Sequence, residues 1–139
     1  MKITRDMFDY DDEAVIVTVN ERRYRVTTEF DYDSSPDDAD CYSDDDKEAW
    51  RNDVWHYVGV IVTPLDVPAS ARNQLDDSLW GVEYDFPLDP PQWIDGILYR
   101  YTDRDYTVMV HPVPEMIEEV IRNEQAYLTE LAIQSYIYS

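Results

Sequence analysis

A single helix pattern near the C-terminal end, preceded only by strand patterns, is the feature that most constrains the fold of this sequence. The helix is predicted from Pro114, which suits a first helical position, to about Gln134. Acidic residues in its first turns and apolar residues at helical spacing support this prediction: Glu115, Glu118, Glu119, Ile117, Val120, Ile121, Leu128, Leu131 and Ala132. Strands without βαβ alternation before one helix predict an α+β domain, in which an antiparallel sheet of about four to six strands packs against the helix.

The first strands are expected as a hairpin over residues 13–30. Apolar and polar residues alternate on both sides of Asn20-Glu21, which predicts a tight turn there. The polar face carries three of the eleven basic residues, Arg22, Arg23 and Arg25. These arginines are interpreted either as solvated cross-strand partners or as charges that neutralise the acidic segment that follows.

Two further strands are predicted after that acidic segment. Residues 54–63, VWHYVGVIVT, form a nearly continuous apolar run that is typical of a strand buried on both faces. Residues 78–85 alternate in polarity and are expected as the partner strand. The connector between the two strands, 64–77, has room for a short helical turn at about 71–75.

The segment before the C-terminal helix is divided into two parts by its prolines. Three prolines exclude regular structure over residues 86–92. The runs ILYRY and YTVMV within residues 93–110 favour a second hairpin, and a helix over the same residues is the alternative. No internal repeat or glycine-rich tract divides the chain, so its 139 residues are expected to form one domain, 1–139.

An acid-rich segment, residues 29–53, separates the first hairpin from the later strands. It carries eleven acidic side chains against Lys47 and Arg51, which is a net charge of −9. Its apolar residues are too sparse to dock it on a core, so we expect a solvated acidic loop at about 31–53 with room for one helical turn. The carboxylates of this loop are the predicted partner-binding residues: Asp31, Asp33, Asp37, Asp38, Asp40, Asp44, Asp45, Asp46 and Glu48.

The whole chain has a formal charge of −20, from 31 acidic and 11 basic residues. A field of this sign repels the phosphates of nucleic acids and membranes and attracts basic protein surfaces. We therefore expect neither nucleic acid nor a membrane as a direct partner. The N-terminal residues lack the apolar core of a signal peptide, and the single cysteine, Cys41, fits a reducing compartment, so a cytoplasmic location is expected.

The sequence contains no pattern for a metal site, a cofactor or an enzymatic activity. A calcium-loop count that starts at Asp31 places Pro36 where the sharp turn needs glycine, and Tyr42 where the last carboxylate belongs. The two histidines are too scattered for a zinc site, since His56 lies within an apolar strand pattern and His111 in a predicted loop. No serine stands in a nucleophile motif. We therefore expect no metal, no cofactor and no catalytic residues.

Two segments carry a resemblance. The pairing of WHYVGVIVT, residues 55–63, with DSLWGVEYD, residues 77–85, resembles a pattern in small acidic proteins of actinobacterial phages and plasmids, a group without an assigned activity. The resemblance covers about a fifth of the chain and implies a mobile-element origin. Acidic proteins of this size in mobile elements resemble, by class, the DNA mimics that inhibit restriction and CRISPR systems. No residue role is implied by that analogy.

We therefore predict a non-enzymatic acidic inhibitor whose carboxylates stand in for DNA phosphates in the groove of a basic nucleic-acid-binding protein. The clustering of the acids favours this interpretation over acidity for solvation alone, which would spread them evenly. The alternative is a structural or accessory phage or plasmid protein, acidic for solubility, that acts as a homo-oligomer such as a homodimer. The nearly uncharged segment 132–139, AIQSYIYS, is the candidate for such a contact, or else a plain helix end.

Overall fold

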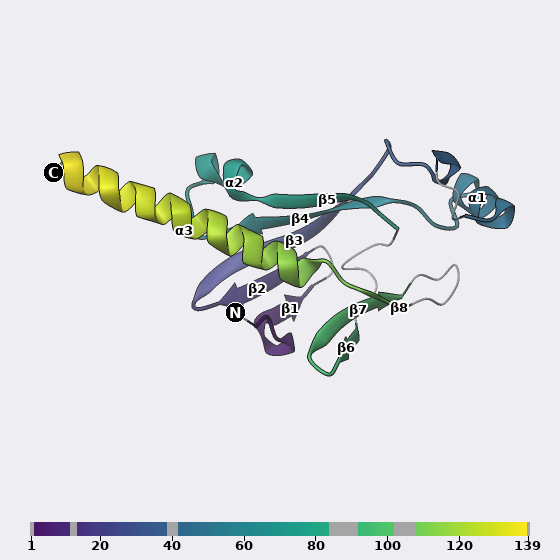
Figure 1. Cartoon of the computed structure of the whole chain (residues 1–139), viewed down its shortest axis with the longest axis horizontal. Coiled ribbons are helices and arrows are strands. Elements are labelled where there is room, and N and C mark those ends of the chain that lie inside the picture. Colours follow the sequence, from purple (N-terminus) through teal and green to yellow (C-terminus); the bar gives the residue numbers. More distant parts are fainter. Residues whose placement is uncertain (1, 12–13, 39–41, 84–91, 102–107, 139) are drawn as a thin grey trace.

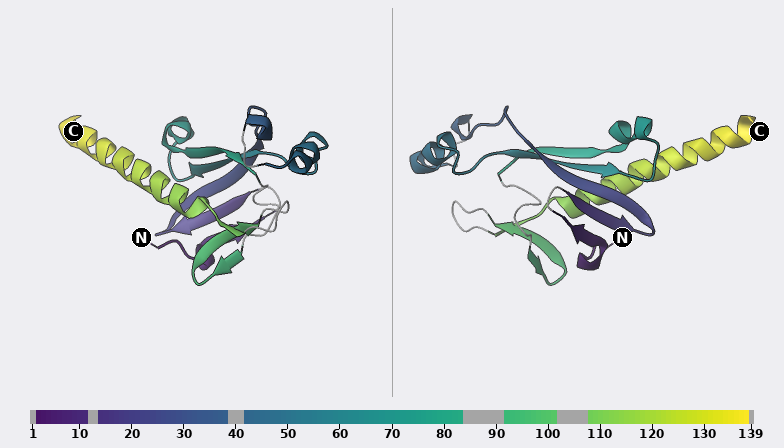
Figure 2. Two further views of the ribbon diagram at one scale, coloured as in Figure 1. Left: turned by 45° about the vertical axis from the view of Figure 1, so that its right-hand side comes forward. Right: turned by 180° about the vertical axis from the view of Figure 1, so that it is seen from behind.

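The computed structural model describes residues 2–11, 14–38, 42–83, 92–101 and 108–138 (Figure 1). Five strands form one antiparallel sheet in the order β1-β2-β3-β4-β5, so each strand pairs with its neighbour in the sequence. The strands are β1 (Phe8–Tyr10), β2 (Val15–Val19), β3 (Arg22–Phe30), β4 (Val58–Pro64) and β5 (Asp77–Val82). A long C-terminal helix, α3 (Val113–Tyr138), crosses one face of this sheet (Figures 1 and 2). The predicted α+β class and the packing of sheet against helix are confirmed.

The predicted first hairpin is formed by β2 and β3. Val19 pairs with Arg22 across the turn, and both turn residues have positive φ, 50° at Asn20 and 67° at Glu21. Two central residues with positive φ match the right-handed twist of the flanking strands, so the tight turn sets the register of the hairpin. A short strand that the sequence analysis did not predict, β1, then adds to the outer side of β2.

The core lies between the sheet and α3. Alternate residues are buried along β2 and β4 and in the middle of β3, and the helix contributes apolar residues spaced three and four apart. These fully buried residues include Val15, Val17, Val26, Val58, Val60, Val62, Val113, Ile117 and Val120. Burial of each such side chain contributes roughly 1.5–3 kcal/mol, which makes this face the main source of stability.

Helix α3 is longer than predicted. It begins at Val113, one residue before Pro114, and continues to Tyr138 instead of ending near Gln134. Residues 132–138 contain no glycine or proline that would end a helix, which explains the extension. Its last turns extend past the edge of the sheet (Figure 1).

The strand predicted over 54–63 is shorter in the structure, because β4 begins only at Val58. Trp55 and Tyr57 precede the strand and are buried against the acid-rich segment instead of in the sheet. His56, interpreted as a core or edge histidine of the strand, also precedes it and stacks on Phe30 with ring centroids 5.0 Å apart. An apolar run in the sequence does not show whether its residues are buried within a sheet or against a neighbouring segment.

The connector and the partner strand follow the prediction closely. The helical turn is α2 (Ala69–Leu75), and β5 begins at Asp77. Of the predicted strand 78–85, residues 78–82 belong to β5, and residues 84 and 85 lie outside the described residues. The β4–β5 ladder contains a bulge, because Trp80 and Gly81 together oppose Gly59.

A second sheet has the order β6-β7-β8 and consists of β6 (Gln92–Ile94), β7 (Ile97–Tyr101) and β8 (Val108–Val110). The antiparallel β7–β8 pair confirms the second hairpin over its helical alternative. Strand β6 was not predicted, and it places Gln92 in regular structure, contrary to expectation; residues 86–91 lie outside the described residues. The ring of Trp93 meets that of Phe8 edge-on at 5.4 Å and so joins the two sheets.

Candidate protein-binding surface

The acid-rich segment is folded where the structure describes it, and its helix, Asp44–Arg51, is longer than the single helical turn expected within a loop. Pro36–Asp38 form a 3-10 turn, η2, and Asp44–Arg51 form the helix α1. The Ser43 hydroxyl caps this helix by accepting the Asp46 N–H at 3.1 Å. Because Asp44, Asp45 and Asp46 occupy the first turn, their negative charges lie near the positive end of the helix dipole.

The C-terminal end of α1 is also closed by a defined hydrogen-bond pattern. The Asp53 N–H donates to the Trp50 carbonyl at 3.1 Å, and the Val54 N–H donates to the Ala49 carbonyl at 2.9 Å. Asp53 has a φ of 59°, so these bonds form a Schellman motif with a left-handed residue at the position where glycine is usual. The motif turns the chain back toward Trp55.

An aromatic cluster anchors α1 to the end of the sheet. The rings of Tyr42 and Trp55 stack with centroids 5.6 Å apart, and Trp55 meets Tyr57 edge-on at 5.2 Å. The Tyr57 hydroxyl donates to the Tyr42 hydroxyl at 3.0 Å, and the Tyr42 hydroxyl donates to Glu83 just after β5. Trp55, only 9% exposed, donates its indole N–H to the Asp46 carbonyl at 2.9 Å. The acidic helix is therefore held in one orientation by side chains on both flanks.

Burial of the Tyr42 ring, together with the Glu83 carboxylate beside its hydroxyl, raises the pKa of Tyr42 above its ordinary value. The phenol is therefore neutral at physiological pH and acts as a hydrogen-bond donor to Glu83. The Tyr42–Glu83 bond links the acid-rich segment to the chain that follows β5.

Asp31 is part of the folded framework and is not on the surface. Its side chain is 6% exposed and accepts the Ser34 hydroxyl at 2.7 Å and the N–H groups of Asp33, Ser34 and Gly81 at 2.9, 3.2 and 2.8 Å. The Ser34 hydroxyl, with these N–H groups, lowers the pKa of the Asp31 carboxyl. With both oxygens engaged within the chain, Asp31 has no place in a partner-binding surface.

The other predicted carboxylates are mostly exposed at one end of the molecule, around α1 (Figure 1). Asp33, Asp44, Asp45 and Glu48 are exposed, and Asp46 is half-buried. Asp37 is exposed and accepts a hydrogen bond from Arg51 at 2.8 Å, which ties η2 to α1. Asp38 ends η2, its side chain lying outside the description, and Asp40 lies outside the described residues. We name the surface formed by Asp37, Asp44, Asp45 and Glu48 the α1 surface.

The arginines of the first hairpin do not neutralise this surface where their partners are described. Arg22 Nε donates to Glu124 of α3 at 2.7 Å, and Arg23 pairs with Asp66 at 2.9 Å. The interpretation as charges that offset the acidic segment is therefore wrong for these two residues. The α1 surface keeps a net negative charge, since the Arg51–Asp37 pair offsets only one of its four carboxylates.

A buried polar cluster between β3 and α3 was not found from the sequence. Glu124 is 0% exposed, and its Oε1 accepts hydrogen bonds from Arg22 Nε and from the Tyr24 hydroxyl, each at 2.7 Å. Burial and the Glu124 carboxylate raise the pKa of Tyr24. The sequence signal for this cluster was the position of Glu124, which continues the helical spacing of the apolar residues Ile117 and Val120. The cluster is enclosed by the core and is interpreted as a structural clamp.

His111 is the second histidine of the chain. It lies in the loop before α3, as expected, but it is buried, and its Nδ1 accepts the Val113 N–H at 3.2 Å. Within the described part of the chain, no three His, Cys, Asp or Glu side chains are placed to share a metal ion. No helix in that part is long and apolar enough to span a membrane.

No family model matches the chain, and neither a curated protein nor a solved structure matches it. The fold and the α1 surface define an acidic α+β domain.

Proposed function

We propose that this chain is a non-enzymatic protein-binding domain that places the α1 surface in the basic groove of a nucleic-acid-handling protein. One observation carries the proposal. Asp44, Asp45 and Glu48 are exposed on a helix that Ser43 caps and Trp55 anchors, so their charges are presented from a defined scaffold.

Presentation from a scaffold matters because binding by a flexible acidic loop loses conformational freedom. A helix that is already folded avoids much of this cost, and its charges can match those of a groove that is built for phosphates. The short aspartate side chain also keeps its carboxylate close to the backbone. The same aspartates stabilise the N-terminal turn of α1, and the two roles are compatible because that interaction leaves the carboxylates exposed.

The partner class follows from charge and from the resemblance of residues 55–63 and 77–85 to segments of phage and plasmid proteins. In this proposal the chain acts in the host cytoplasm as an inhibitor of a defence nuclease of the restriction or CRISPR type. Its formal charge of −20 accelerates encounter with a basic groove and excludes DNA as a direct ligand.

The experiment compares two variants of equal charge. The test variant carries Asp44→Asn, Asp45→Asn and Glu48→Gln, and the control carries Glu21→Gln, Asp95→Asn and Glu130→Gln, which are exposed carboxylates on other elements. Immobilised protein is exposed to bacterial lysate, and bound proteins are eluted with duplex DNA or with sodium chloride. A protein eluted by DNA is then purified and titrated against both variants.

The proposal requires binding that weakens steeply with salt, that DNA displaces, and that the α1 variant weakens about tenfold or more while the control stays within about twofold. Equal losses in both variants would indicate a diffuse field and would contradict the proposal. Binding that resists both salt and DNA would contradict it as well.

A second candidate function is a structural protein that assembles through α3. The last turns of this helix extend beyond the sheet and expose apolar side chains: Leu131, Ile133, Tyr136 and Ile137 (Figure 1). Tyr136 is 86% exposed. Light scattering would show a dimer that the substitutions Ile133→Glu and Ile137→Glu dissociate. A monomer at all accessible concentrations would exclude this function.

A further inference from the structure

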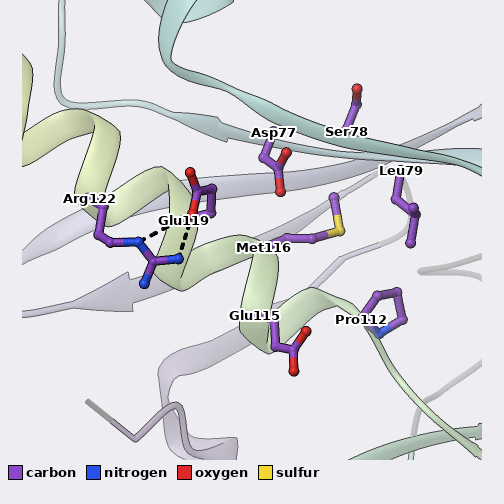
Figure 3. Close-up of a pocket in the computed structure, with 8 residues that line it drawn as sticks. All are labelled: Asp77, Ser78, Leu79, Pro112, Glu115, Met116, Glu119 and Arg122. Atoms are coloured by element: carbon purple, nitrogen blue, oxygen red, sulfur yellow. Dashed lines mark hydrogen bonds and ion pairs between the residues drawn. The ribbon is translucent and has the colours of Figure 1, made fainter.

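An open groove lies between the start of β5 and the first turns of α3 (Figure 3). Strand β5 starts at the end of the sheet that lies away from α1 (Figure 1). The groove has a volume of about 380 Å³. Its lining residues come from these two elements: Asp77, Ser78, Leu79, Pro112, Glu115, Met116, Glu119 and Arg122.

One wall of the groove is the edge of the sheet. Strand β5 is the last strand in the order β1-β2-β3-β4-β5, and within the described residues it pairs only with β4. Asp77 and Leu79 point toward α3 and Ser78 points away, yet all three line the groove (Figure 3). Side chains alternate along a strand, so Ser78, whose side chain points away, lines the groove through its backbone, on a strand whose other side pairs with no described strand.

The bulge limits how far this edge can accept another strand. Trp80 and Gly81 oppose the single residue Gly59, and the Gly81 N–H donates to Asp31 at 2.8 Å. Bulges usually end or redirect pairing at a sheet edge. The accessible edge is thus the short stretch Asp77–Leu79, which can pair with a few residues of an extended chain.

The residues on the floor and rim of the groove determine which kind of extended chain can bind there. Leu79, Pro112 and Met116 offer apolar contacts, whereas Asp77, Glu115 and Glu119 contribute carboxylates. Arg122 donates to Glu119 at 2.5 Å and offsets one of these charges, so the groove keeps a net negative charge. Asp77 and Leu79 share the face toward α3, so an occupant needs a basic and an apolar side chain on that same face, at positions two residues apart.

We propose that this groove binds an extended basic peptide of a partner protein by strand addition to β5, with lysine or arginine side chains directed at Asp77 and Glu115. A second copy of this chain fits the groove poorly. The edge residues Asp77–Val82 contain one acid and no base, and each copy carries a formal charge of −20. This site is separate from the α1 surface and does not depend on the function proposed for it.

The test uses the six-residue peptide Lys-Thr-Val-Thr-Lys-Thr, in which lysine and valine share one strand face, and follows the backbone amide signals of the full chain by NMR. A second peptide has the same sequence with backbone N-methyl groups at alternate residues, which removes the donors needed for strand pairing and keeps the charge. We expect the first peptide to shift the signals of residues 77–79 and 115–119, and the methylated peptide to bind about tenfold more weakly.

Matched substitutions separate the groove from the general field. Glu115→Lys alters a groove residue, and Glu118→Lys makes the same charge change at a helix position that does not line the groove. We expect the first variant to weaken the peptide about fivefold more than the second. The triple α1 variant should bind the peptide as well as the unmodified chain does, since the two sites are distinct.

Three outcomes would overturn the proposal. Equal binding of the two peptides would show that backbone pairing plays no part. Signal changes confined to residues 44–51 would show that the peptide is attracted only to the α1 surface. Shifts of residues 77–79 with protein concentration, without peptide, would make a second copy of the chain the occupant.

Discussion

The six-membered ring of Trp80 on β5 lies directly against the backbone of Gly59 on β4, and a Cβ atom at position 59 would overlap this ring. The contact occurs at the bulge where Trp80 and Gly81 oppose Gly59. The bulge releases the Gly81 N–H, which donates to Asp31 at the start of the acid-rich segment. Gly59 leaves room for the Trp80 ring at the bulge, and the bulge in turn links the β4–β5 ladder to the acid-rich segment through Gly81 and Asp31.

Replacing Gly59 with alanine should therefore destabilise the fold. Because the new methyl group overlaps the indole ring, we expect the free energy of unfolding to fall by roughly 1–3 kcal/mol, as for other overpacked sites. Urea unfolding monitored by tryptophan fluorescence measures this change. In the double variant Gly59→Ala with Trp80→Ala the overlap is gone, so the two losses should be less than additive. Additive losses would show that the ring does not press on position 59.

Helix α1 should be sensitive to its two caps. Ser43→Ala removes the acceptor for the Asp46 N–H and should destabilise the helix by about 1 kcal/mol. Asp53→Gly relieves a left-handed residue and should stabilise it by about 1 kcal/mol. Hydrogen exchange of the amides of Lys47 and Asn52, which donate within or at the end of the helix, reports both changes. Free exchange of these amides in the unmodified chain would contradict the folded α1.

The stability of the fold should depend on the hydrogen bonds that Glu124 accepts. Glu124→Ala leaves the Tyr24 hydroxyl and Arg22 Nε without their acceptor and opens a cavity, so we expect the free energy of unfolding to fall by about 3 kcal/mol or more. Glu124→Gln keeps an oxygen acceptor and should lose less. Thermal or chemical unfolding distinguishes the two variants. Equal losses would assign the effect to charge alone.

The stability of the chain should depend on the ionisation of Asp31. Its pKa is lower in the folded chain than the unfolded value of about 3.9, so the carboxylate stabilises the fold above that pH, and the contribution is lost as the pH falls through the folded pKa. Asp31→Asn should be less stable at pH 7 by roughly 1–3 kcal/mol because hydrogen bonds are lost.

The difference in free energy of unfolding between Asp31→Asn and the unmodified chain should shrink as the pH falls from about 5 to 2, because Asp31 of the unmodified chain is then protonated. Unfolding free energies at several pH values measure the difference. Asp33→Asn, at an exposed neighbour, is the matched control and should show no comparable effect at pH 7. A constant difference between Asp31→Asn and the unmodified chain would mean that the Asp31 carboxylate is not responsible.

The sequence by itself determined the elements whose pattern is local. The alternation around Asn20-Glu21 specified the first hairpin, and the period of apolar residues after Pro114 specified α3, because each pattern needs only one buried face to be readable. The runs ILYRY and YTVMV specified the β7–β8 hairpin in the same way. The excess of acids in residues 29–53 was equally plain.

Only the tertiary structure decided what that acidic segment does. Asp31 is buried because a bulge fifty residues later in the sequence releases the Gly81 N–H, and Glu124 is buried because Arg22 and Tyr24 reach it from about a hundred residues away. Helix α1 is held against Trp55 by contacts that no period of the segment reveals. A carboxylate in a loop and a carboxylate that clamps two elements have the same side chain. They differ in the donors that surround them, and those donors come together only when the sheet and α3 have packed.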